Sequence, residues 1–312
     1  MCWGYSQSVN YAQRLFPDFS LIVCGYLVCR YTALNRTVGG QVESLVYYFL
    51  FPVLLFHSIV KSPLDLRATS SLIFAGLLTG LATIALAYCL PHLPGLGKVI
   101  DKRLHAASAQ VAFRFNSFIG LALADRLVPG QGPLLIAVLI GVCVPMFNVA
   151  AVWPMARAGQ TGFARELSRN PLILATACGL AANLAGFTLP LWLEPTVTRI
   201  GAASLALGLL AAGAGMQLGH LAGAKTLGVA VLLIRHAIAP LVALGFAKAF
   251  ALPPAQATIL LAFAALPTAS SCYVLAARMG FNGGYVAGLV TLSTLLGMAS
   301  LPFSLGVLGQ WL

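Results

Sequence analysis

Ten continuous apolar segments take up most of this chain and leave few folds open to it. Each is long enough to cross a hydrocarbon layer of about 30 Å as a helix that rises about 1.5 Å per residue. The apolar residues follow one another without alternation, so a membrane β-barrel is excluded. We therefore predict an all-α polytopic membrane protein with ten transmembrane helices. The segments lie at about residues 12–30, 41–61, 70–91, 105–127, 132–156, 171–191, 198–219, 226–250, 255–278 and 284–311.

The composition agrees with a chain whose main solvent is lipid. Hydrophobic residues make up 60% of the 312 residues and charged residues only 8%, whereas about a quarter of a soluble domain is charged. A net charge of +11 would suggest nucleic acid for a soluble protein. In a membrane protein, basic loops instead set the orientation, so we expect no nucleic-acid partner. The seven cysteines form no CxxC pair and no zinc-type spacing, so we expect no metal and no cofactor.

Basic residues in the connectors predict how the chain sits in the membrane. Ten lysines and arginines lie in the connectors after segments 1, 3, 5, 7 and 9, against six on the opposite side. This bias places the central connector in the cytoplasm and both termini outside. We expect a single transport domain in the cell (inner) membrane. It consists of one half at about 1–157, a connector at about 158–169 and a second half at about 170–312.

The two halves are similar at segments 4 and 9. "QVAFRFNSFIGLALADRL" and "LLAFAALPTASSCYVLAARM" each contain an Ala-Phe pair followed by a polar interruption. Because each half has five spans, an odd number, the second half is inverted relative to the first. Inverted repeats with interrupted helices at mid-membrane point to the binding site of a secondary transporter. We predict two inverted five-helix repeats with broken crossover helices 4 and 9.

The polar residues at these interruptions are the candidate site. Proline removes a backbone donor and leaves an earlier carbonyl unpaired, and a membrane helix tolerates such a break where it lines a cavity. A half-helix that begins at the break presents its N–H groups to an anion. The predicted substrate-binding residues are Asn116, Ser117, Pro267, Thr268, Ser271, Arg114 and Arg235.

Arg114 and Arg235 place charge inside apolar segments. Inserting an arginine at the centre of a bilayer costs about 2.5–3.5 kcal/mol on insertion scales. All seven acidic residues fall in connectors or near segment ends, so the sequence predicts no carboxylate at mid-membrane. A basic interior suits an anionic ligand. For Arg235, a buried contact with a backbone carbonyl or a carboxylate is the alternative. For Arg114, the alternative is a side chain that extends to the cytoplasmic interface. His57 and His236 are candidate proton carriers, and a satisfied buried histidine is the alternative for His57.

Small residues dominate segment 7, which contains "GAASLALGLLAAGAG". In membranes, helices approach one another closely where their contact faces carry small residues. We therefore expect segment 7 to pack tightly against a neighbouring helix.

Several of these motifs resemble the auxin efflux carrier family in its bacterial branch. "YYFLFPVLLFHSI" is similar to the family's Phe-Pro-Leu-Leu-Phe pattern, with His57 matching a histidine of plant members. "FRFNSFIGLAL" resembles the asparagine-containing first crossover helix. The resemblance extends to "NPLILATACGLAANLAG", "LPTASSCYVLAARMG" and "VTLSTLLGMASLP", in the sixth, ninth and last spans. It covers nearly the whole chain.

The resemblance implies a transporter with ten helices in two inverted repeats. Helices 1, 2, 6 and 7 would form a scaffold, and the others a transport domain that moves by elevator-like alternating access. The implied substrates are small organic anions, such as the dicarboxylates malonate and malate, moved by an ion gradient or the membrane potential. Asn116 and Pro267 take the places of the family's crossover residues. The chain departs from plant members at Phe115, where they have proline, and in segment 3, which has no acid.

The sequence also allows other functions. The substrate could be an aromatic carboxylate or another small solute, and a sensor that does not transport is a further alternative. An intramembrane enzyme would need a nucleophile with its base, or carboxylates that hold a metal. The chain has no G-x-S-x-G motif, and we expect no enzyme. The coupling ion, the direction of transport and assembly as a homodimer are left open.

Overall fold

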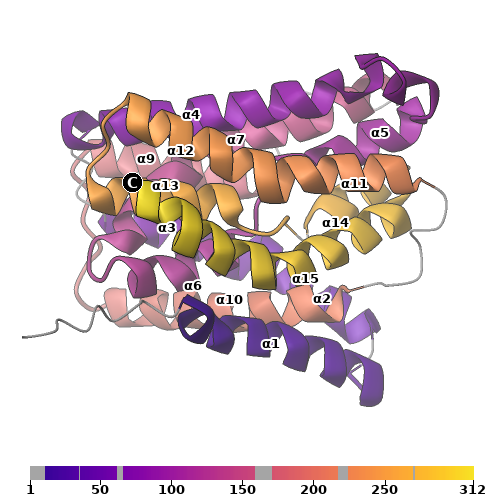
Figure 1. Cartoon of the computed structure of the whole chain (residues 1–312). Coiled ribbons are helices and arrows are strands. Elements are labelled where there is room, and N and C mark those ends of the chain that lie inside the picture. The colour runs from indigo at the N-terminus through magenta and orange to yellow at the C-terminus, as the bar shows by residue number, and fades with distance from the viewer. Residues whose placement is uncertain (1–10, 35, 62–65, 159–170, 217–223, 270) are drawn as a thin grey trace, which may run out of the picture.

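The computed structural model describes residues 11–34, 36–61, 66–158, 171–216, 224–269 and 271–312, which form a bundle of helices (Figure 1). All regular secondary structure among these residues is helical, which confirms the all-α prediction. The predicted central connector lies outside them, apart from Ala158. Among the described residues, five helices are long and apolar enough to cross a membrane, namely Thr37–Lys61, Thr69–His92, Gly132–Arg157, Lys225–Ala249 and Gly283–Trp311.

Helices occur in both halves of the chain, and two of the long ones contain a π-helical turn. The first half comprises α1 (Tyr11–Tyr31), α2 (Arg36–Leu45), η1 (Val46–Leu50), α3 (Phe51–Lys61), α4 (Leu66–Cys89), α5 (Lys102–Ser108), η4 (Ala109–Ala112), α6 (Ser117–Leu127) and α7 (Gly132–Ala158). The second comprises α9 (Pro171–Leu184), α10 (Glu194–Ala214), α11 (Lys225–Leu233), η5 (Ile234–Ile238), α12 (Ala239–Ala249), α13 (Pro254–Ala265), α14 (Ser271–Arg278) and α15 (Gly283–Val307). Short 3-10 turns lie at Leu90–His92, Leu96–Lys98 and Leu308–Trp311. The π-helical turns η1 and η5 join α2 to α3 and α11 to α12.

The predicted boundaries differ most at segment 6, which was expected to reach residue 191. Helix α9 ends at Leu184 instead. Gly186 has a φ of 70°, the left-handed conformation in which glycine commonly ends a helix. The next residues are not helical, and α10 begins at Glu194.

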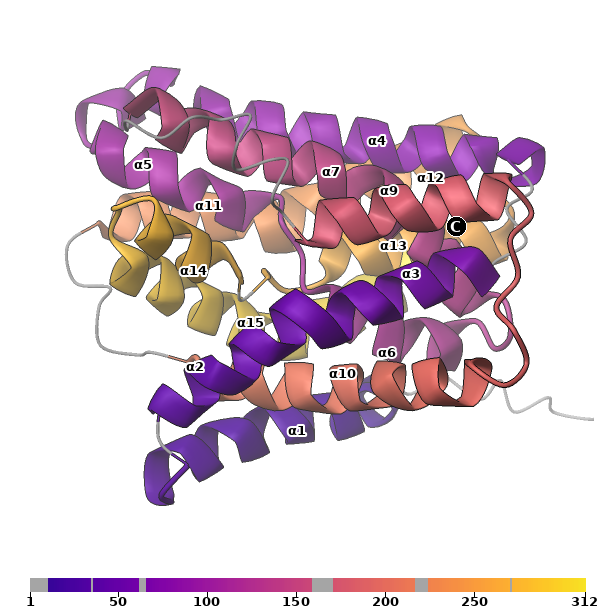
Figure 2. The same ribbon diagram turned by 180° about the vertical axis from the view of Figure 1, so that it is seen from behind.

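The helices lie side by side in a fixed order across the bundle. In both ribbon views α1 and α10 lie along one edge and α4 along the opposite edge, with α6 and α13 between them (Figure 1 and Figure 2). Helix α1 packs on α10, α3 packs on α9, and α4 packs on α7 and α12. The broken helices therefore occupy the interior of the bundle.

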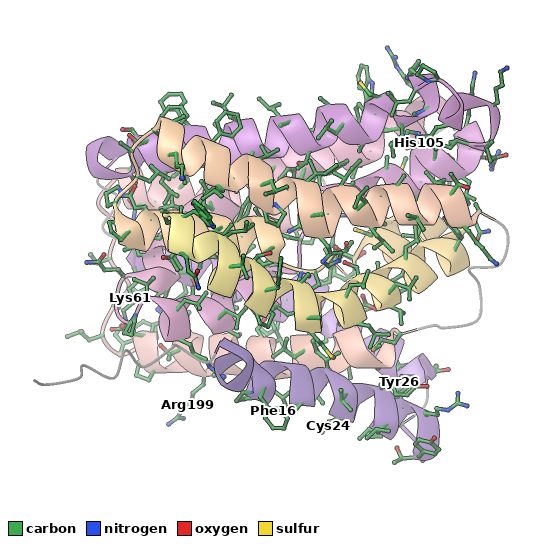
Figure 3. The ribbon with its side chains drawn as sticks, viewed as in Figure 1. Phe16, Cys24, Tyr26, Lys61, His105 and Arg199 are labelled. Carbon is green, nitrogen blue, oxygen red and sulfur yellow. The ribbon has the colours of Figure 1, made fainter. Side chains whose placement is uncertain are left out.

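The outer surface of the bundle is apolar, and charged side chains lie at its ends. Phe16 and Cys24 project outwards from α1 (Figure 3), and large side chains such as Trp192 and Val229 are 78% and 66% exposed. Lys61, near one end of the bundle, forms an ion pair with Glu194 at 2.8 Å. Exposed apolar surface of this extent marks contact with a membrane or with other proteins.

Glycines bring α1 and α10 into very close contact. A Cβ atom on Gly213 would lie 1.8 Å from the carbonyl oxygen of Ile22, and one on Gly25 would lie 2.0 Å from that of Leu210. No side chain larger than hydrogen fits at either position without moving a backbone. The predicted tight packing of segment 7 is confirmed.

Segments 4 and 9 are interrupted where the sequence predicts, and their two breaks meet. The first break lies between η4, which ends at Ala112, and α6, which begins at Ser117. The second lies between α13, which ends at Ala265, and α14, which begins at Ser271. Two hydrogen bonds join the breaks. The Asn116 amide N–H donates to the carbonyl of Pro267 at 2.8 Å, and the Thr268 hydroxyl donates to the carbonyl of Val111 at 2.8 Å.

The first break forms without a proline. Phe115 packs its ring 4.5 Å from that of Phe263 and 6.0 Å from that of Phe147, centroid to centroid. Asn116 then caps α6, because its Oδ1 accepts from the amide of Ile119 at 3.3 Å, a common way to begin a helix. Aromatic packing and a capping side chain thus accompany the break in place of a fixed proline ring.

Arg235, in η5, donates hydrogen bonds to main-chain carbonyls at both breaks. Its Nε donates to the carbonyl of Leu266 at 2.6 Å, Nη1 to that of Phe113 at 3.3 Å and Nη2 to that of Phe263 at 3.1 Å. Pro267 has no N–H to donate to Phe263, four residues earlier, and the other two carbonyls lie at the breaks themselves. The side chain is 3% exposed. Arg235 therefore supplies a donor to three carbonyls at the breaks, where the regular helical hydrogen bonding is interrupted.

We expect Arg235→Met to destabilise the protein severely, because three buried acceptors lose their donor at about 1–3 kcal/mol each. The apparent Tm of the detergent-purified protein should fall by about 10 °C or more, as measured by a thermal unfolding assay. Arg199→Met serves as the matched control, since Arg199 is an exposed arginine in the second turn of α10. An Arg235→Met protein as stable as the control would contradict this role for Arg235.

Candidate functional site

A small pocket lies against the crossing of the two breaks. One wall comes from α2, η1 and α3, another from α7, a third from α10, and the last from the breaks themselves. The volume of the pocket that is open to the centre of a water molecule is about 60 Å³. One water needs about 10–15 Å³ by this measure, so the pocket accommodates a few waters or one small molecule. Its lining residues are Glu43, Val46, Tyr47, Phe51, Arg114, Phe115, Asn116, Ser117, Val144, Phe147, Asn148, Gly208, Ala211, Ala269 and Ser271.

Four of the predicted substrate-binding residues line this pocket together. Arg114, Asn116 and Ser117 come from the first break, and Ser271 comes from the start of α14 after the second. Arg114 is 6% exposed. Its Nη1 donates to Oε1 of Gln110 at 2.9 Å, and its Nη2 donates to Oγ of Ser271 at 3.0 Å. The guanidinium is thus fixed between the two broken helices, at the wall of the pocket.

The other three predicted substrate contacts, Pro267, Thr268 and Arg235, do not line the pocket. The polar groups of Thr268 are used inside the crossing. Its amide donates to Oγ of Ser293 at 2.9 Å, and its hydroxyl accepts from Ser293 at 2.9 Å while donating to Val111. The sequence predicted these three residues as ligand contacts. In the structure they form hydrogen bonds within the crossing of the two breaks. The carbonyl contacts of Arg235 are the alternative that the sequence left open.

The two predicted proton carriers also lie away from the pocket. His57, on α3, is 8% exposed, and its Nε2 has no hydrogen-bond partner among the described residues. The ring nitrogens of His236 lie 2.8 Å from Oγ of Ser300 and 2.9 Å from Oγ of Ser293. Ser293 also contacts Thr268, so His236 is connected to the crossing. A role for either histidine in proton coupling stays a prediction.

Asn148 is a pocket residue that the sequence reasoning missed. It lies within α7, is 2% exposed, and lines the pocket. Its buried amide nitrogen, Nδ2, has no hydrogen-bond partner among the described residues. A buried donor without a partner is costly, so this amide is suited to a ligand acceptor. A lone asparagine in an otherwise apolar membrane segment was the signal that could have found it.

Glu43 corrects one conclusion drawn from the sequence. The sequence placed every acid in a connector or near a segment end, and so predicted no carboxylate near the arginines. Helix α2 begins at Arg36, so Glu43 lies two turns inside it and lines the same pocket as Arg114. The Tyr273 hydroxyl on α14 donates a hydrogen bond to Oε2 of Glu43. The error arose because the helix starts several residues before the apolar pattern does.

The pocket therefore combines one guanidinium, two amide side chains, two serine hydroxyls, one tyrosine hydroxyl and one carboxylate within mostly aromatic and aliphatic walls. Nearly all of these polar groups can donate hydrogen bonds, and α6 directs its N-terminus towards the same place. Donors and a positive charge at a helix N-terminus suit a small anion.

Two comparisons relate this chain to known proteins. The family model described as "Membrane transport protein" matches residues 98–305, a range that contains both breaks, Arg114 and Asn148. A protein of Rhizobium meliloti (strain 1021), named "Putative malonate transporter", is 24% identical over 307 residues that cover 92% of each chain. The family match spans more than half of the chain, and the predicted resemblance to the auxin efflux carriers is confirmed. This multi-pass membrane protein therefore belongs to the membrane transport protein family, the family of the auxin efflux carriers.

Proposed function

We propose that this protein is a secondary transporter of small organic anions, dicarboxylates such as malonate among them, and that the pocket at the crossing binds the substrate. The observation that carries this proposal is the position of Arg114, a buried cation on the wall of a small pocket. The malonate named for the Rhizobium meliloti relative supports the substrate class. A three-carbon dianion also agrees with the size of the pocket.

The charge of Arg114 supports an anionic substrate. Both of its known partners, Gln110 and Ser271, are neutral. Among the described residues no carboxylate lies within 4.0 Å of its guanidinium. A buried guanidinium gains most from a carboxylate, because charge-assisted hydrogen bonds are about twice as strong as neutral ones. The substrate would supply that carboxylate.

Two further donors support a second contact on the substrate. Asn148 offers its unpartnered Nδ2 from the α7 wall. Ser117 begins α6, whose N-terminal amides carry partial positive charge. Arg114 and Asn148 come from separate walls of the pocket, so a dicarboxylate with one group at each end would satisfy both. A monocarboxylate would leave one of them without an acceptor.

Repeated helix pairings support the inverted-repeat architecture of ten spans. If helices 1 to 5 correspond to helices 6 to 10, the pair of helices 1 and 7 corresponds to the pair 6 and 2. Both pairs pack closely, as α1 with α10 and α9 with α3. The second half of each broken helix also packs on the helix that follows it, as α6 with α7 and α14 with α15. The two breaks occupy corresponding spans, 4 and 9.

The position of the pocket supports an elevator-like mechanism. Helices α1, α2, α3, α9 and α10 pack on one another and form the proposed scaffold group. The pocket takes one part of its wall from this group and the other part from α7 and the breaks. A substrate bound there would lie between a fixed group and a moving group. The cell inner membrane, the cytoplasmic connector and the external termini predicted from the loop charges belong to the same proposal.

We expect Arg114→Gln to reduce malonate affinity by about 10- to 100-fold, because it removes a charge-assisted contact worth about 1.5–3 kcal/mol. The measurement is counterflow of labelled malonate in proteoliposomes, with binding to the purified protein measured in parallel. Arg199→Gln is the matched control, since it removes an exposed arginine outside the pocket. Equal affinity in the Arg114 variant and the control would rule out this site.

Asn148→Ala should lower malonate affinity by about 2- to 10-fold, the effect of losing one neutral hydrogen bond. The buried donor has no protein partner to lose among the described residues. Any fall in the apparent Tm without ligand should therefore come only from the lost packing of the Asn148 side chain. The same binding assay measures the affinity, and thermal unfolding measures the stability. A variant that is much less stable but binds malonate normally would show that Asn148 serves the fold instead.

A further inference from the structure

Glu43 brings a negative charge into the pocket that the proposed function assigns to an anion. It is half-buried on α2, and it lines the pocket together with Arg114 and Asn148. An ionised Glu43 would repel a carboxylate substrate, and the repulsion is strong where protein excludes water. An anion site that keeps a carboxylate in its wall therefore needs a way to neutralise it.

We propose that Glu43 is the binding site for a proton that accompanies the substrate, so that the protein is a proton-coupled anion carrier; this inference rests on the proposed function. With Glu43 ionised, its charge balances that of Arg114 across the pocket and the site is neutral. With Glu43 protonated, the pocket carries the net positive charge of Arg114 and attracts the anion. The bound proton and the bound carboxylate thus favour each other's binding, as linkage requires.

The hydrogen bond from Tyr273 gives the proton a second effect. Glu43 belongs to the scaffold group, through α2, whereas Tyr273 lies on α14, after the second break. A hydroxyl bonds more strongly to an ionised carboxylate than to a neutral one. Protonation of Glu43 therefore weakens a contact between the two groups of helices at the moment when the substrate binds. The empty, unprotonated carrier would keep this contact.

Glu43 is the carboxylic acid among the described residues that line this pocket, and it is therefore the group there best suited to exchange a proton. Around it the pocket presents two other ionisable side chains, Arg114 and Tyr47, and Tyr273 contacts it from α14. Arginine and tyrosine as classes keep their protons below about pH 9. Helices α1 and α10 also pack on α2, and no ionisable residue of either lines the pocket. Those with described side chains are Cys24, Tyr26, Cys29, Arg30 and Tyr31 on α1, and Glu194 and Arg199 in the first turns of α10.

The test compares wild type with Glu43→Gln, whose amide resembles the protonated acid. Malonate binding to each purified protein is measured by isothermal titration calorimetry from pH 6 to pH 8, in buffers of different ionisation enthalpy that report proton uptake. As the pH rises, the malonate affinity of wild type should fall relative to that of the variant by up to about tenfold per pH unit. Wild type should also take up about one more proton per bound malonate than the variant does. The ionisation of malonate itself affects both proteins equally and cancels in the comparison.

Glu194→Gln is the matched control, because Glu194 is a carboxylate paired with Lys61 outside the pocket. It should keep the pH dependence of wild type. If the Glu43 variant and wild type share one pH dependence, Glu43 is not the proton site, while malonate binding itself would still support the proposed function. If wild type binds no malonate at any pH, both proposals are overturned.

Tyr273→Phe provides a second variant that keeps the carboxylate. It removes the hydrogen bond that favours ionised Glu43. The protonated form then persists to higher pH, so the pH at which malonate affinity begins to fall should move upward. An unchanged pH profile in a folded Tyr273→Phe protein would count against the proposal even where the Glu43 variant fails to fold.

Discussion

Arg235 donates hydrogen bonds to three main-chain carbonyls at the breaks, where the regular helical bonding is interrupted, and the rest of the site depends on this contact. Within a membrane there is no bulk water to satisfy such groups, so an irregular backbone persists only where protein donors reach it. Arg235 donates to the carbonyls of Phe113, Phe263 and Leu266, and the amide of Asn116 satisfies that of Pro267. Because the crossing is closed from within, its other face is free to present Arg114, Asn116, Ser117 and Ser271 to the pocket.

The two buried arginines thus have different tasks, and the carbonyl contacts of Arg235 are the alternative that the sequence left open. Arg235 donates to three carbonyls of the backbone, whereas Arg114 is held by neutral side chains and has a charge that no described carboxylate pairs. Glu43 shares the pocket without neutralising Arg114 directly. A cation, a titratable acid and an unpartnered amide on separate walls give one small pocket the means to bind an anion and a proton together.

The sequence predicted what depends on local patterns and missed what depends on tertiary contacts. Apolar segment length predicted the helices, and the polar interruptions predicted both breaks, because each signal lies within one stretch of chain. The partners of Arg235 lie 28 to 122 residues away, so the sequence could not choose between an anion and the carbonyls. Asn148 lies in a helix with no interruption. Glu43 was misplaced because α2 begins before its apolar residues do.

An experimental structure determined with bound malonate is the most direct test of the central claim, which is that the crossing of the broken helices forms the substrate site. The account predicts ligand density in the pocket, with one carboxylate at the guanidinium of Arg114 and the other within hydrogen-bond distance of Nδ2 of Asn148. Arg235 should keep its three carbonyl contacts in that complex. Malonate bound away from the crossing, or bound to Arg235 in place of those carbonyls, would contradict the account.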